Sequence, residues 1–455
     1  MQDALRDAAV TREVAIEPGV ARRLPEVAGR CAPGAPCMVI ADGNTWPAAG
    51  AAAQAALQAH AAGAVSPLVL PAQPRLKPRA ETAQAIAQQL QAQDAVPVAA
   101  GSGVINDLVK YAAALAGKPY LCLATAPSMD GYAASGAALL QDGFKRTLAC
   151  PPPVAVLADP GVLAGAPARM AAWGYGDLAG KLVAGADWLL ADALGIEPIN
   201  AAPFALVQDH LGEWLGQPRR LAARDPQALG ALLSGLLVSG FAMQAHGNSR
   251  PASGSDHQFS HLWEMENLQV DGEPAAHGAC VGVGCVAMLA LYDWLLAQPQ
   301  AMLRQVQVED LDDRRAIDAE IEASLGTGEV AAAARQEMAA KRALGSRQGR
   351  VARFVAAWPQ LRGQVAARLI GAARMQQQLQ EAGAPAHPAA LGLELATLAA
   401  DYRRARLIRR RYTLLDLLED LGWLDRAIAD LFGAQGFWSR SPVTPAAAAG
   451  APMQP

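Results

Sequence analysis

The chain has 455 residues, 52% of them hydrophobic and 18% charged, enough for two or more domains with full cores. Its formal net charge of −4 excludes a general nucleic-acid binder, because such a protein needs a large basic surface. The N-terminus lacks a signal-peptide pattern, and glycines and serines interrupt the longest apolar segment, 228–245. Because the six cysteines form no CxxC pair, we expect reduced thiols and hence a cytoplasmic protein. We also expect no membrane span.

Alternating strands and helices are predicted from residue 37 to residue 163. Short apolar runs bounded by Gly, Pro or Asn predict strands, and Ala-rich stretches between them predict helices. The expected strands are 37–42, 66–71, 95–103, 119–125 and one within 151–163, and the expected helices are 46–62, 80–93 and 104–116. Residues 137–149 read as a hairpin through Asp142-Gly143. The alternation is typical of an open parallel sheet, so residues 1–163 are expected to form an α/β domain.

Helical patterns dominate after residue 163, and we place a domain boundary there. The expected helices are 168–194, 203–215, 226–246, 253–268, 276–297, 308–323, 329–342, 350–358, 363–382, 390–407 and 413–432. Residues 164–438 are therefore expected to form an all-helical domain. The Pro/Ala-rich segment 439–455 is expected to be a disordered tail.

A glycine-containing turn, AAGSGVINDLVKY (99–111), follows one predicted strand and opens a helix. Gly101 and Gly103 let the backbone approach a phosphate closely, and the helix N-terminus favours negative charge. The spacing is not GxGxxG, so the turn is either a nucleotide-binding turn or an ordinary strand-to-helix turn. Asp42, at the end of the first predicted strand, is either a helix cap or an acceptor for a nucleotide ribose.

A second loop, TAPSMDGYAAS (125–135), follows the fourth predicted strand, where open α/β sheets place ligand-binding loops. It offers the hydroxyls of Thr125 and Ser128 and the carboxylate of Asp130. The alternative is a polar loop with an Asx-turn. Its position after the strand favours ligand binding.

Three of the seven histidines fall within 21 consecutive residues, at 257, 261 and 277. His257 and His261 are four apart, so on a helix both imidazoles project from one face. Asp177 either stabilises a helix dipole or offers an oxygen ligand. One carboxylate with two imidazoles leaves a divalent metal open positions for substrate, as a catalytic site requires.

Basic residues occur at two further places. Ser249 and Arg250 lead into the predicted histidine helix, where hydroxyls and a guanidinium suggest an anionic ligand. Six arginines lie between Arg403 and Arg411. They form either a phosphate- or partner-binding patch or a solvated, ion-paired helix face, and the acidic net charge favours the second.

These motifs resemble a known family, the sn-glycerol-1-phosphate dehydrogenases, in particular the bacterial AraM-type proteins. The matching stretches are GSGVINDLVKY, TAPSMDGYAASGA, GYGDLAGKLVAGADW, GNSRPASGSDHQFSHLWEM and HGACVGVG. The wider superfamily contains iron-containing alcohol dehydrogenases, glycerol dehydrogenase and dehydroquinate synthase. The resemblance implies a dehydroquinate synthase-like fold, with a dinucleotide-binding α/β domain before a helical metal- and substrate-binding domain.

The resemblance also implies roles for individual residues. The metal ligands, for Zn²⁺ or Ni²⁺, would be Asp177, His257 and His277. The NAD(P)-binding residues would be Asp42, Gly101, Ser102, Gly103, Asp107, Thr125 and Ser128. Asp130 would contact substrate near the metal, and His261 would lie beside the reacting oxygen and relay a proton. The chain departs from the usual pattern at Asp256, commonly Glu, and at Ser255, commonly Ala.

The predicted reaction is reversible hydride transfer between NAD(P)H and dihydroxyacetone phosphate, giving sn-glycerol 1-phosphate. Ser249 and Arg250 are the candidates for contacting the substrate phosphate, and Asp42 favours NAD over NADP. A homodimer is expected. The alternatives are a glycerol or polyol dehydrogenase, a dehydroquinate-synthase-like lyase, and a non-catalytic binding relative.

Overall fold

The structure is a computed structural model that describes residues 1–58, 63–141, 144–303, 306 and 314–441. Two compact units make up the chain. One contains Met1–Leu178 and Ala205–Ser249, and the other contains Ala179–Phe204 and Arg250–Pro455. Helix α7 (Ala168–Ala193) belongs to both units, because the division falls within it at Leu178.

A six-stranded parallel sheet forms the core of the first unit, in the order β1-β8-β5-β4-β2-β3. The strands are β1 (Glu13–Ile16), β2 (Cys37–Asp42), β3 (Leu68–Leu70), β4 (Val96–Gly101), β5 (Leu121–Ala124) and β8 (Ala155–Ala158). From β2 the chain moves outward to β3 and then returns to the other side of β2 as β4. The strand order therefore reverses between β2 and β4, the position where open α/β sheets bind ligands.

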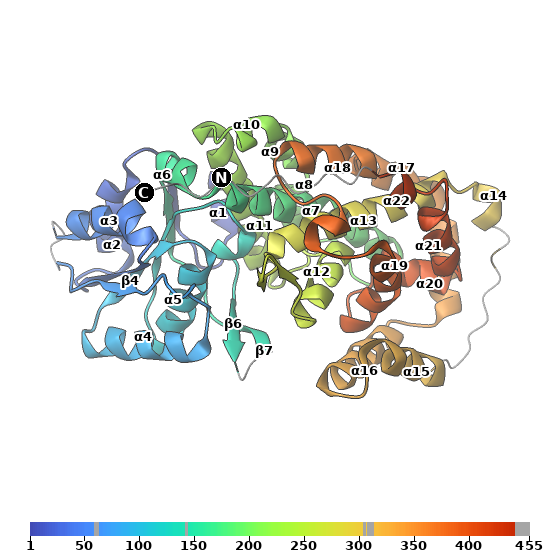
Figure 1. Cartoon of the computed structure of the whole chain (residues 1–455), viewed down its shortest axis with the longest axis horizontal. Coiled ribbons are helices and arrows are strands. Elements are labelled where there is room, and N and C mark those ends of the chain that lie inside the picture. Colours follow the sequence, from blue (N-terminus) through green and yellow to red (C-terminus); the bar gives the residue numbers. More distant parts are fainter. Residues whose placement is uncertain (59–62, 142–143, 304–305, 307–313, 442–455) are drawn as a thin grey trace. The chain divides into compact units, whose positions relative to one another are not determined.

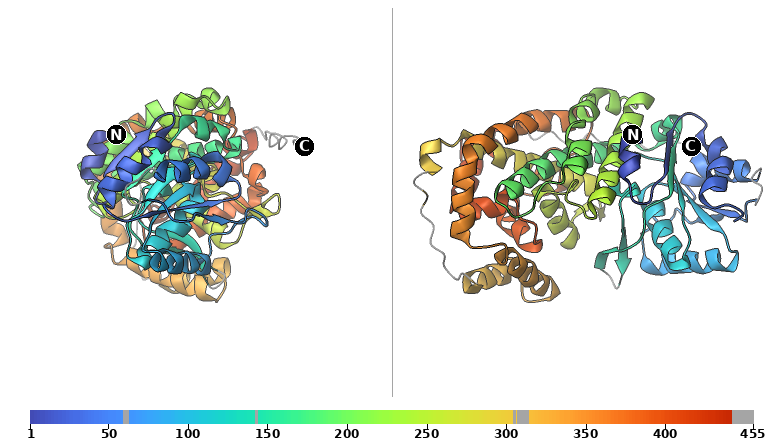
Figure 2. Two further views of the ribbon diagram at one scale, coloured as in Figure 1. Left: turned by 90° about the vertical axis from the view of Figure 1, so that its left-hand side faces the viewer. Right: turned by 180° about the vertical axis from the view of Figure 1, so that it is seen from behind.

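Helices cover both faces of this sheet (Figures 1 and 2). Strand residues alternate between the faces: Cys37, Val39 and Ala41 of β2 join the apolar core beneath α2 (Leu24–Cys31) and α3 (Ala51–Leu57). Met38 and Ile40 point to the opposite face and are also fully buried. Helices α4 (Ala80–Ala92) and α5 (Gly103–Ala116) cover that face. Burial on both faces explains why the strands read as continuous apolar runs.

The predicted α/β pattern is confirmed, with corrections. Strand β1 was not predicted: it is four residues long, contains Glu13, and pairs with the distant strand β8, where Glu13 lies opposite Ala155, so local pattern does not reveal it. The hairpin strands β6 (Ala137–Gln141) and β7 (Phe144–Leu148) are antiparallel as predicted, although the turn at 142–143 lies outside the described residues.

The rest of the chain is mostly helical, as predicted. Its α-helices after α7 are α8 (Ala201–Gln208), α9 (Leu211–Leu215), α10 (Pro218–Ala222), α11 (Pro226–His246), α12 (Ser255–Met265), α13 (His277–Ala297), α14 (Gln300–Leu303), α15 (Arg314–Leu325), α16 (Glu329–Arg342), α17 (Arg347–Arg368), α18 (Ala372–Glu381), α19 (Leu395–Arg404), α20 (Leu414–Asp420), α21 (Leu424–Phe432) and α22 (Phe437–Arg440). The break expected between helices 350–358 and 363–382 is wrong, because α17 continues through Pro359 with Phe354 and Trp358 buried.

The predicted boundary near residue 163 remains a prediction. The sheet ends with β8, followed by α6 (Pro160–Gly165), whereas the compact units group residues 205–249 with the sheet. Of the predicted tail, 439–440 belong to α22 and 442–455 lie outside the described residues.

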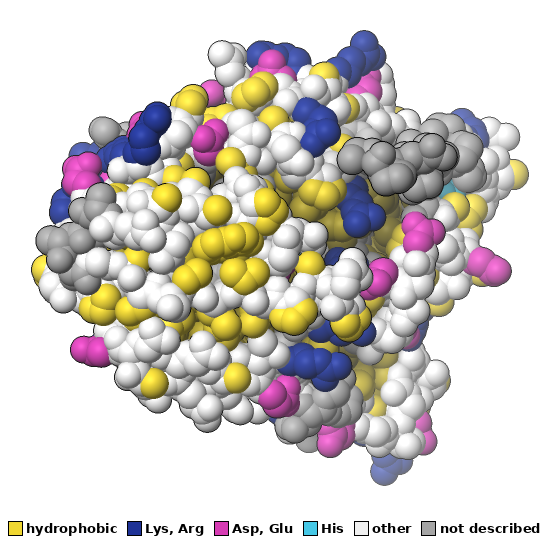
Figure 3. Space-filling view, turned by 60° about the vertical axis from the view of Figure 1, so that its left-hand side comes forward, with side chains coloured by type: hydrophobic (Ala, Val, Ile, Leu, Met, Phe, Trp, Pro, Cys, Tyr) yellow, Lys and Arg dark blue, Asp and Glu magenta, His cyan; other side chains and the backbone are white. Residues whose placement is uncertain are grey.

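Two helices, α11 and α13, are long and apolar enough to cross a membrane by length and composition. Their most apolar windows are 78% and 89% buried, and core helices pass the same test, so this is weak evidence for a membrane span. All six cysteines carry free thiols, as predicted. On the face in Figure 3, basic and acidic side chains are interspersed among uncharged and hydrophobic ones.

Glycines let α12 approach its neighbours closely. A Cβ at Gly254 would lie 2.8 Å from Ala184 Cα on α7, and one at Gly284 on α13 would lie 2.6 Å from the carbonyl oxygen of Asp256. A Cβ at Gly180 on α7 would overlap Oδ2 of Asp256. Helix α12 therefore occupies its position because these positions lack side chains.

We predict that Gly180→Ala lowers the free energy of unfolding by about 1–3 kcal/mol, because the added methyl group displaces the Asp256 carboxylate. Gly363→Ala is the matched control within α17, since a Cβ there meets nothing within 4 Å. The control is expected to raise stability by about 0.4–1 kcal/mol. Denaturant titration of both variants measures the difference, and equal effects would contradict the packing argument.

Candidate metal and cofactor site

Asp42 ends β2 and faces the position where the strand order reverses. Its Oδ1 accepts hydrogen bonds from the backbone N–H groups of Asn44 (2.9 Å) and Thr45 (2.8 Å). Asp42 thus closes the turn after β2, whereas Thr45 is the N-cap of the helical segment Trp46–Gly50, so the helix-capping alternative is wrong. The carboxylate has a second oxygen, so the turn and the predicted contact with a ribose are compatible.

The glycine turn follows β4, the strand beside β2. A Cβ at Gly101 would lie 2.5 Å from the Cβ of Ile105, so the turn requires glycine there. Ser102 is the N-cap of α5 but makes no side-chain capping bond. The first N–H groups of this 14-residue helix are thus suited to an anion such as pyrophosphate. Gly103 is the first residue of the helix.

Asp107 lies further along α5 and is mostly buried. Its Oδ1 is 3.9 Å from Nζ of Lys110, which also donates to the carbonyl oxygens of Gly131 and Ala134. The structure thus connects Asp107 through Lys110 to the loop after β5. Its predicted place in the pyrophosphate-binding turn stays a prediction.

The loop after β5 lies beside the glycine turn and reaches α7. The N–H of Thr125 donates to the carbonyl of Gly101 at 3.2 Å, and Ser128 is half-buried. The N–H of Asp130 donates to Oδ2 of Asp177 at 2.9 Å, and Ser239 Oγ donates to Asp130 Oδ2 at 3.3 Å. One loop therefore links the predicted nicotinamide-side residues to a predicted metal ligand.

Asp177, His257 and His277 form a group that can hold a metal ion. Each offers one ligand atom, and these atoms all lie within 4.8 Å of one another. Asp177 precedes Gly180 by less than one turn of the same helix, and Gly180 contacts Asp256, the neighbour of His257. The structure thus brings together the three residues proposed as ligands from the sequence.

Two carboxylates hold the imidazoles of this group. Nδ1 of His257 is 2.6 Å from Asp256 Oδ2, and Nδ1 of His277 is 2.6 Å from Glu264 Oε1. Ser260 Oγ lies 3.1 Å from the same nitrogen of His277. A carboxylate on Nδ1 assigns the ligand role to Nε2 and raises its basicity, as is common for metal-binding histidines. The donor set, two imidazoles and a carboxylate, fits zinc or nickel.

The roles of Asp256 and Glu264 are not predicted from the sequence, in which Asp256 stands out only as a departure from the family pattern. Its position beside His257, and the position of Glu264 three residues after His261, were available signals, because metal-binding histidines commonly bond a carboxylate. Pairing Glu264 with His277, however, required the tertiary contact of α12 with α13.

His261 lies close to the other two histidines, with its ring centroid 6.2 Å from that of His257 and 6.1 Å from that of His277. Nε of Arg409 donates to its Nδ1 at 3.1 Å. Because a guanidinium only donates, the neutral ring carries its hydrogen on Nε2. Burial, followed by the charge of Arg409, lowers the pKa of His261 well below its usual range. His261 is therefore a neutral hydrogen-bond donor at pH 7.

Arg250 points into the protein interior. Its side chain is fully buried, Nη2 donates to the carbonyl of Asp187 at 2.8 Å, and Nε is 3.2 Å from Glu197 Oε2. This arrangement anchors the loop before α12. Ser249 beside it is exposed. Their contact with the substrate phosphate stays a prediction.

Asp187 on α7 ties together the helices that carry the histidines. Its Oδ2 accepts from the N–H and the hydroxyl of Ser255, both at 2.7 Å, and Oδ1 accepts from Tyr292 Oη (2.7 Å) and the N–H of Leu414 (3.0 Å). It thereby joins the starts of α12 and α20 to α13. Burial raises the pKa of this carboxyl group, so its charge depends on these donors.

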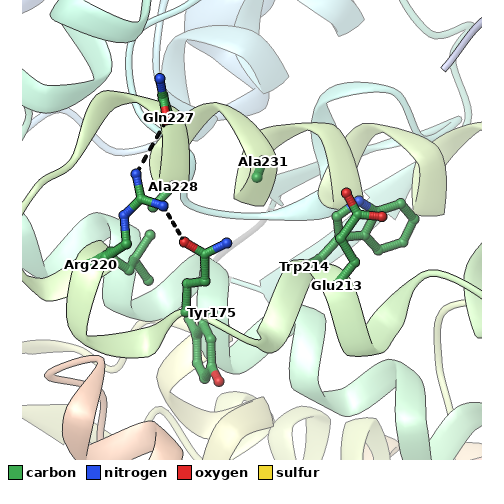
Figure 4. Close-up of a pocket in the computed structure, with 9 residues that line it drawn as sticks. Tyr175, Glu213, Trp214, Arg220, Gln227, Ala228 and Ala231 are labelled. Carbon is green, nitrogen blue, oxygen red and sulfur yellow. Dashed lines mark hydrogen bonds between the residues drawn. The ribbon is translucent and has the colours of Figure 1, made fainter.

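A pocket of about 120 Å³ lies beside α7 but is separate from the metal group. Figure 4 shows Tyr175, Trp214 and Arg220 among its lining residues. Tyr175 and Asp177 are two residues apart on one helix, so they project to roughly opposite sides. The Tyr175 hydroxyl donates to the carbonyl of Leu215. We assign no role in the chemistry to this pocket.

The parallel sheet followed by a mostly helical part is an architecture that the chain shares with the iron-containing alcohol dehydrogenases. The sequence model of that family, described as "Iron-containing alcohol dehydrogenase", matches residues 15–167. The solved glycerol dehydrogenase of Schizosaccharomyces pombe superposes with a TM-score of 0.57, covering 92% of this chain and 90% of that one at 15% identity, which shows the shared fold.

Relatives that carry one shared name identify a narrower family within this class. Glycerol-1-phosphate dehydrogenase [NAD(P)+] of Bacillus velezensis is 40% identical over 197 residues, 43% of this chain and 50% of the relative. The protein of the same name from Thermofilum pendens is 31% identical over 282 residues, 61% of this chain and 78% of the relative. The chain belongs to the glycerol-1-phosphate dehydrogenase family. It spans about half the length of several of the curated relatives that it matches.

We predict that Asp256→Asn and Glu264→Gln each weaken metal affinity about 10- to 100-fold, because the ligand imidazoles lose the carboxylates that orient them. Glu266→Gln is the control, since Glu266 pairs with Arg404 at the surface. Competition with a chelator, followed by metal analysis, measures the affinity. Unchanged affinity in both variants would show that these carboxylates do not support the ligands.

We predict that Asp187→Ala destabilises the unit that contains it by about 3–5 kcal/mol, because buried donors on three elements lose their acceptor. Asp318→Ala, which removes a surface pair at 3.8 Å from Arg335, should change stability by less than about 0.5 kcal/mol. Denaturant unfolding compares the two variants. Similar losses in both would contradict the central position assigned to Asp187.

Proposed function

We propose that this protein catalyses reversible hydride transfer between NAD(P)H and dihydroxyacetone phosphate, giving sn-glycerol 1-phosphate. The observation that carries the proposal is the group Asp177, His257 and His277, with a carboxylate on each imidazole. The relatives named glycerol-1-phosphate dehydrogenase [NAD(P)+] support the choice of substrate.

The bound metal would supply Lewis-acid polarisation of the ketone, and the bound nicotinamide would supply the hydride. Asp177 and the Nε2 atoms of His257 and His277 would hold the metal. The N–H of Asp130 keeps one oxygen of Asp177 in position. His261, with its hydrogen on Nε2, would donate a hydrogen bond to the substrate oxygen. This role replaces the proton relay expected from the sequence, because Arg409 occupies Nδ1.

The first unit would hold the cofactor at the carboxyl ends of β2, β4 and β5. The N-terminus of α5 would bind the pyrophosphate, and the second oxygen of Asp42 would accept from the adenosine ribose. Its negative charge disfavours a 2′-phosphate, so we propose NAD as the preferred cofactor. We also propose that the metal is zinc or nickel, that the protein forms a homodimer and that it is located in the cytoplasm.

The main rival is a glycerol or polyol dehydrogenase that uses the same metal group, as the fold of the S. pombe glycerol dehydrogenase allows. The two functions differ in whether the substrate carries a phosphate. A dehydroquinate-synthase-like lyase differs in returning its NAD unchanged after each turnover. A non-catalytic relative would bind ligands without turnover.

The decisive experiment follows NADH oxidation with dihydroxyacetone phosphate after reconstitution with Zn²⁺ or Ni²⁺. We expect steady NADH consumption that chelator abolishes and that Asp177→Ala or His257→Ala lowers at least 1,000-fold, roughly the loss of about 4 kcal/mol of transition-state stabilisation. His210→Ala, an exposed histidine outside the group, is the control. Equal turnover of dihydroxyacetone would favour the polyol dehydrogenase, and Asp177→Ala with full metal content and activity would refute the site.

A further inference from the structure

Two basic features of the sequence have no part in the proposed reaction. One is the arginine run 403–411, in which four members form ion pairs with carboxylates, as the ion-paired alternative predicted. The pairs are Arg403 with Asp425, Arg404 with Asp401 and Glu266, Arg406 with Glu320, and Arg410 with Glu337. The other feature is Lys110 on α5, which belongs to the stretch GSGVINDLVKY and has a fully buried side chain.

The ammonium group of Lys110 binds three backbone carbonyl groups of the loop after β5. Nζ donates to the carbonyl oxygens of Gly131 at 2.6 Å, Ala134 at 2.9 Å and Gly136 at 3.1 Å. A lysine ammonium has three N–H donors, so these bonds use all of them. Oδ1 of Asp107 lies 3.9 Å from the same nitrogen. Because a buried charge is costly unless polar groups surround it, Lys110 and this part of the loop stabilise each other.

The loop contacts one face of α5 at two points. Lys110 lies about two helical turns after Gly103, so these residues share a face of the helix. A Cβ at Gly103 would lie 2.9 Å from the terminal methyl carbon of Met129. The segment 129–136 therefore packs against the first residue of α5, where pyrophosphate is proposed to bind, and again at Lys110.

The same loop also rests on α7, close to Asp177. A Cβ at Gly174 would overlap the carbonyl oxygen of Pro127, so the loop approaches α7 closely there. Gly174 and Asp177 are neighbours on the helix surface, because they are three residues apart. The N–H of Asp130 donates to Oδ2 of Asp177 at 2.9 Å. All of these residues belong to the first compact unit, so one loop joins α5 to the carboxylate on α7 within that unit.

A second donor holds this loop less firmly than Lys110 does. Nε2 of Gln244 on α11 donates to the carbonyl of Ala133 at 2.6 Å. This is one bond from a neutral amide, whereas Lys110 provides three bonds from a cation. Hydrogen bonds in which one partner is charged are roughly twice as strong as neutral ones. The position of residues 131–136 therefore depends mainly on Lys110.

We propose that Lys110 is a positioning residue for metal binding, which fixes the N–H of Asp130 through the loop carbonyls and thereby orients the carboxylate of Asp177. The inference rests on the metal site of the proposed function. Gly131 connects the two interactions, because its carbonyl is held by Lys110 and the preceding residue donates to Asp177. A donor fixed on one oxygen limits rotation of the carboxylate, and carboxylates that bind metals are commonly held in this way.

The test uses Lys110→Met, which removes all three donors from a side chain of similar length. Lys341→Met is the matched control, since Lys341 is also buried but donates to the carbonyl of Arg406 and to Asp416 in the second unit. Titration of the metal-free full-length proteins with Zn²⁺ measures affinity. We expect Lys110→Met to bind Zn²⁺ about tenfold more weakly, the lower end of the range for residues that orient metal ligands, and Lys341→Met to bind it as the wild type does.

A double-mutant cycle shows whether Lys110 acts through Asp177. In an Asp177→Ala background, adding Lys110→Met should change the residual Zn²⁺ affinity by less than about twofold, because the carboxylate to be oriented is gone. A general weakening of the fold would instead lower affinity by the same factor in both backgrounds. The visible absorption of the Co²⁺-loaded protein is a second readout: its bands should shift in Lys110→Met and stay unchanged in Lys341→Met.

The fold of Lys110→Met is checked by circular dichroism before titration. If it does not fold, Lys110→Gln replaces it, since an amide keeps two N–H donors without the charge, and a smaller loss of Zn²⁺ affinity is expected. Wild-type affinity together with an unchanged Co²⁺ spectrum in the variant that folds would overturn the inference. Equal losses of affinity in the two backgrounds of the cycle would overturn it as well.

Failure of the inference is distinguishable from failure of the proposed function. If the wild type binds no divalent metal, the metal site of the proposed function is wrong. If the cycle shows the expected coupling but no NADH is oxidised, the positioning role stands and the reaction is wrong. If dihydroxyacetone phosphate is reduced but Lys110→Met binds Zn²⁺ as the wild type does, the reaction stands and the positioning role is wrong.

Discussion

The second unit depends on the hydrogen bonds that the buried carboxylate of Asp187 accepts. A fully buried carboxylate is costly unless donors surround it. Here the donors come from Ser255, Tyr292 and Leu414, which begin or belong to α12, α13 and α20. Satisfying one charge therefore fixes three helices relative to α7. The proposed metal ligands on α12 and α13 and the arginine segment before α20 all take their positions from this arrangement.

Close packing and hydrogen bonding then refine the histidine site. Gly180 and Gly284 admit Asp256 between α7 and α13, and Asp256 in turn holds His257. Glu264 holds His277 in the same way, one helix further on. A metal site needs ligands that are close together and also correctly oriented. Here the orientation comes from Asp256 and Glu264, which would not touch the metal themselves.

The cofactor side follows from sheet topology. Parallel strands end at one edge, so Asp42, the glycine turn and the 125–130 loop gather where the strand order reverses. The N–H of Asp130 bonds Asp177, so the same loop that is proposed to contact nicotinamide also orients a proposed metal ligand. In the proposed reaction the nicotinamide and the metal act on the same carbonyl group. The hydrogen bond from Asp130 to Asp177 therefore connects the loop proposed to contact the nicotinamide with a proposed metal ligand.

From the sequence alone, local patterns determined the alternating α/β half, most helices and the glycine turn, and the family resemblance implied the group Asp177, His257 and His277. These are short-range signals, because apolar periodicity and motif spacing depend on neighbours in the chain. Only the tertiary structure decided the edge position of β1, the pairing of Glu264 with His277, the central role of Asp187 and the ion pairs of the arginine run. Each of these joins residues far apart in sequence, and burial and hydrogen bonding between distant segments leave no periodic trace in either one.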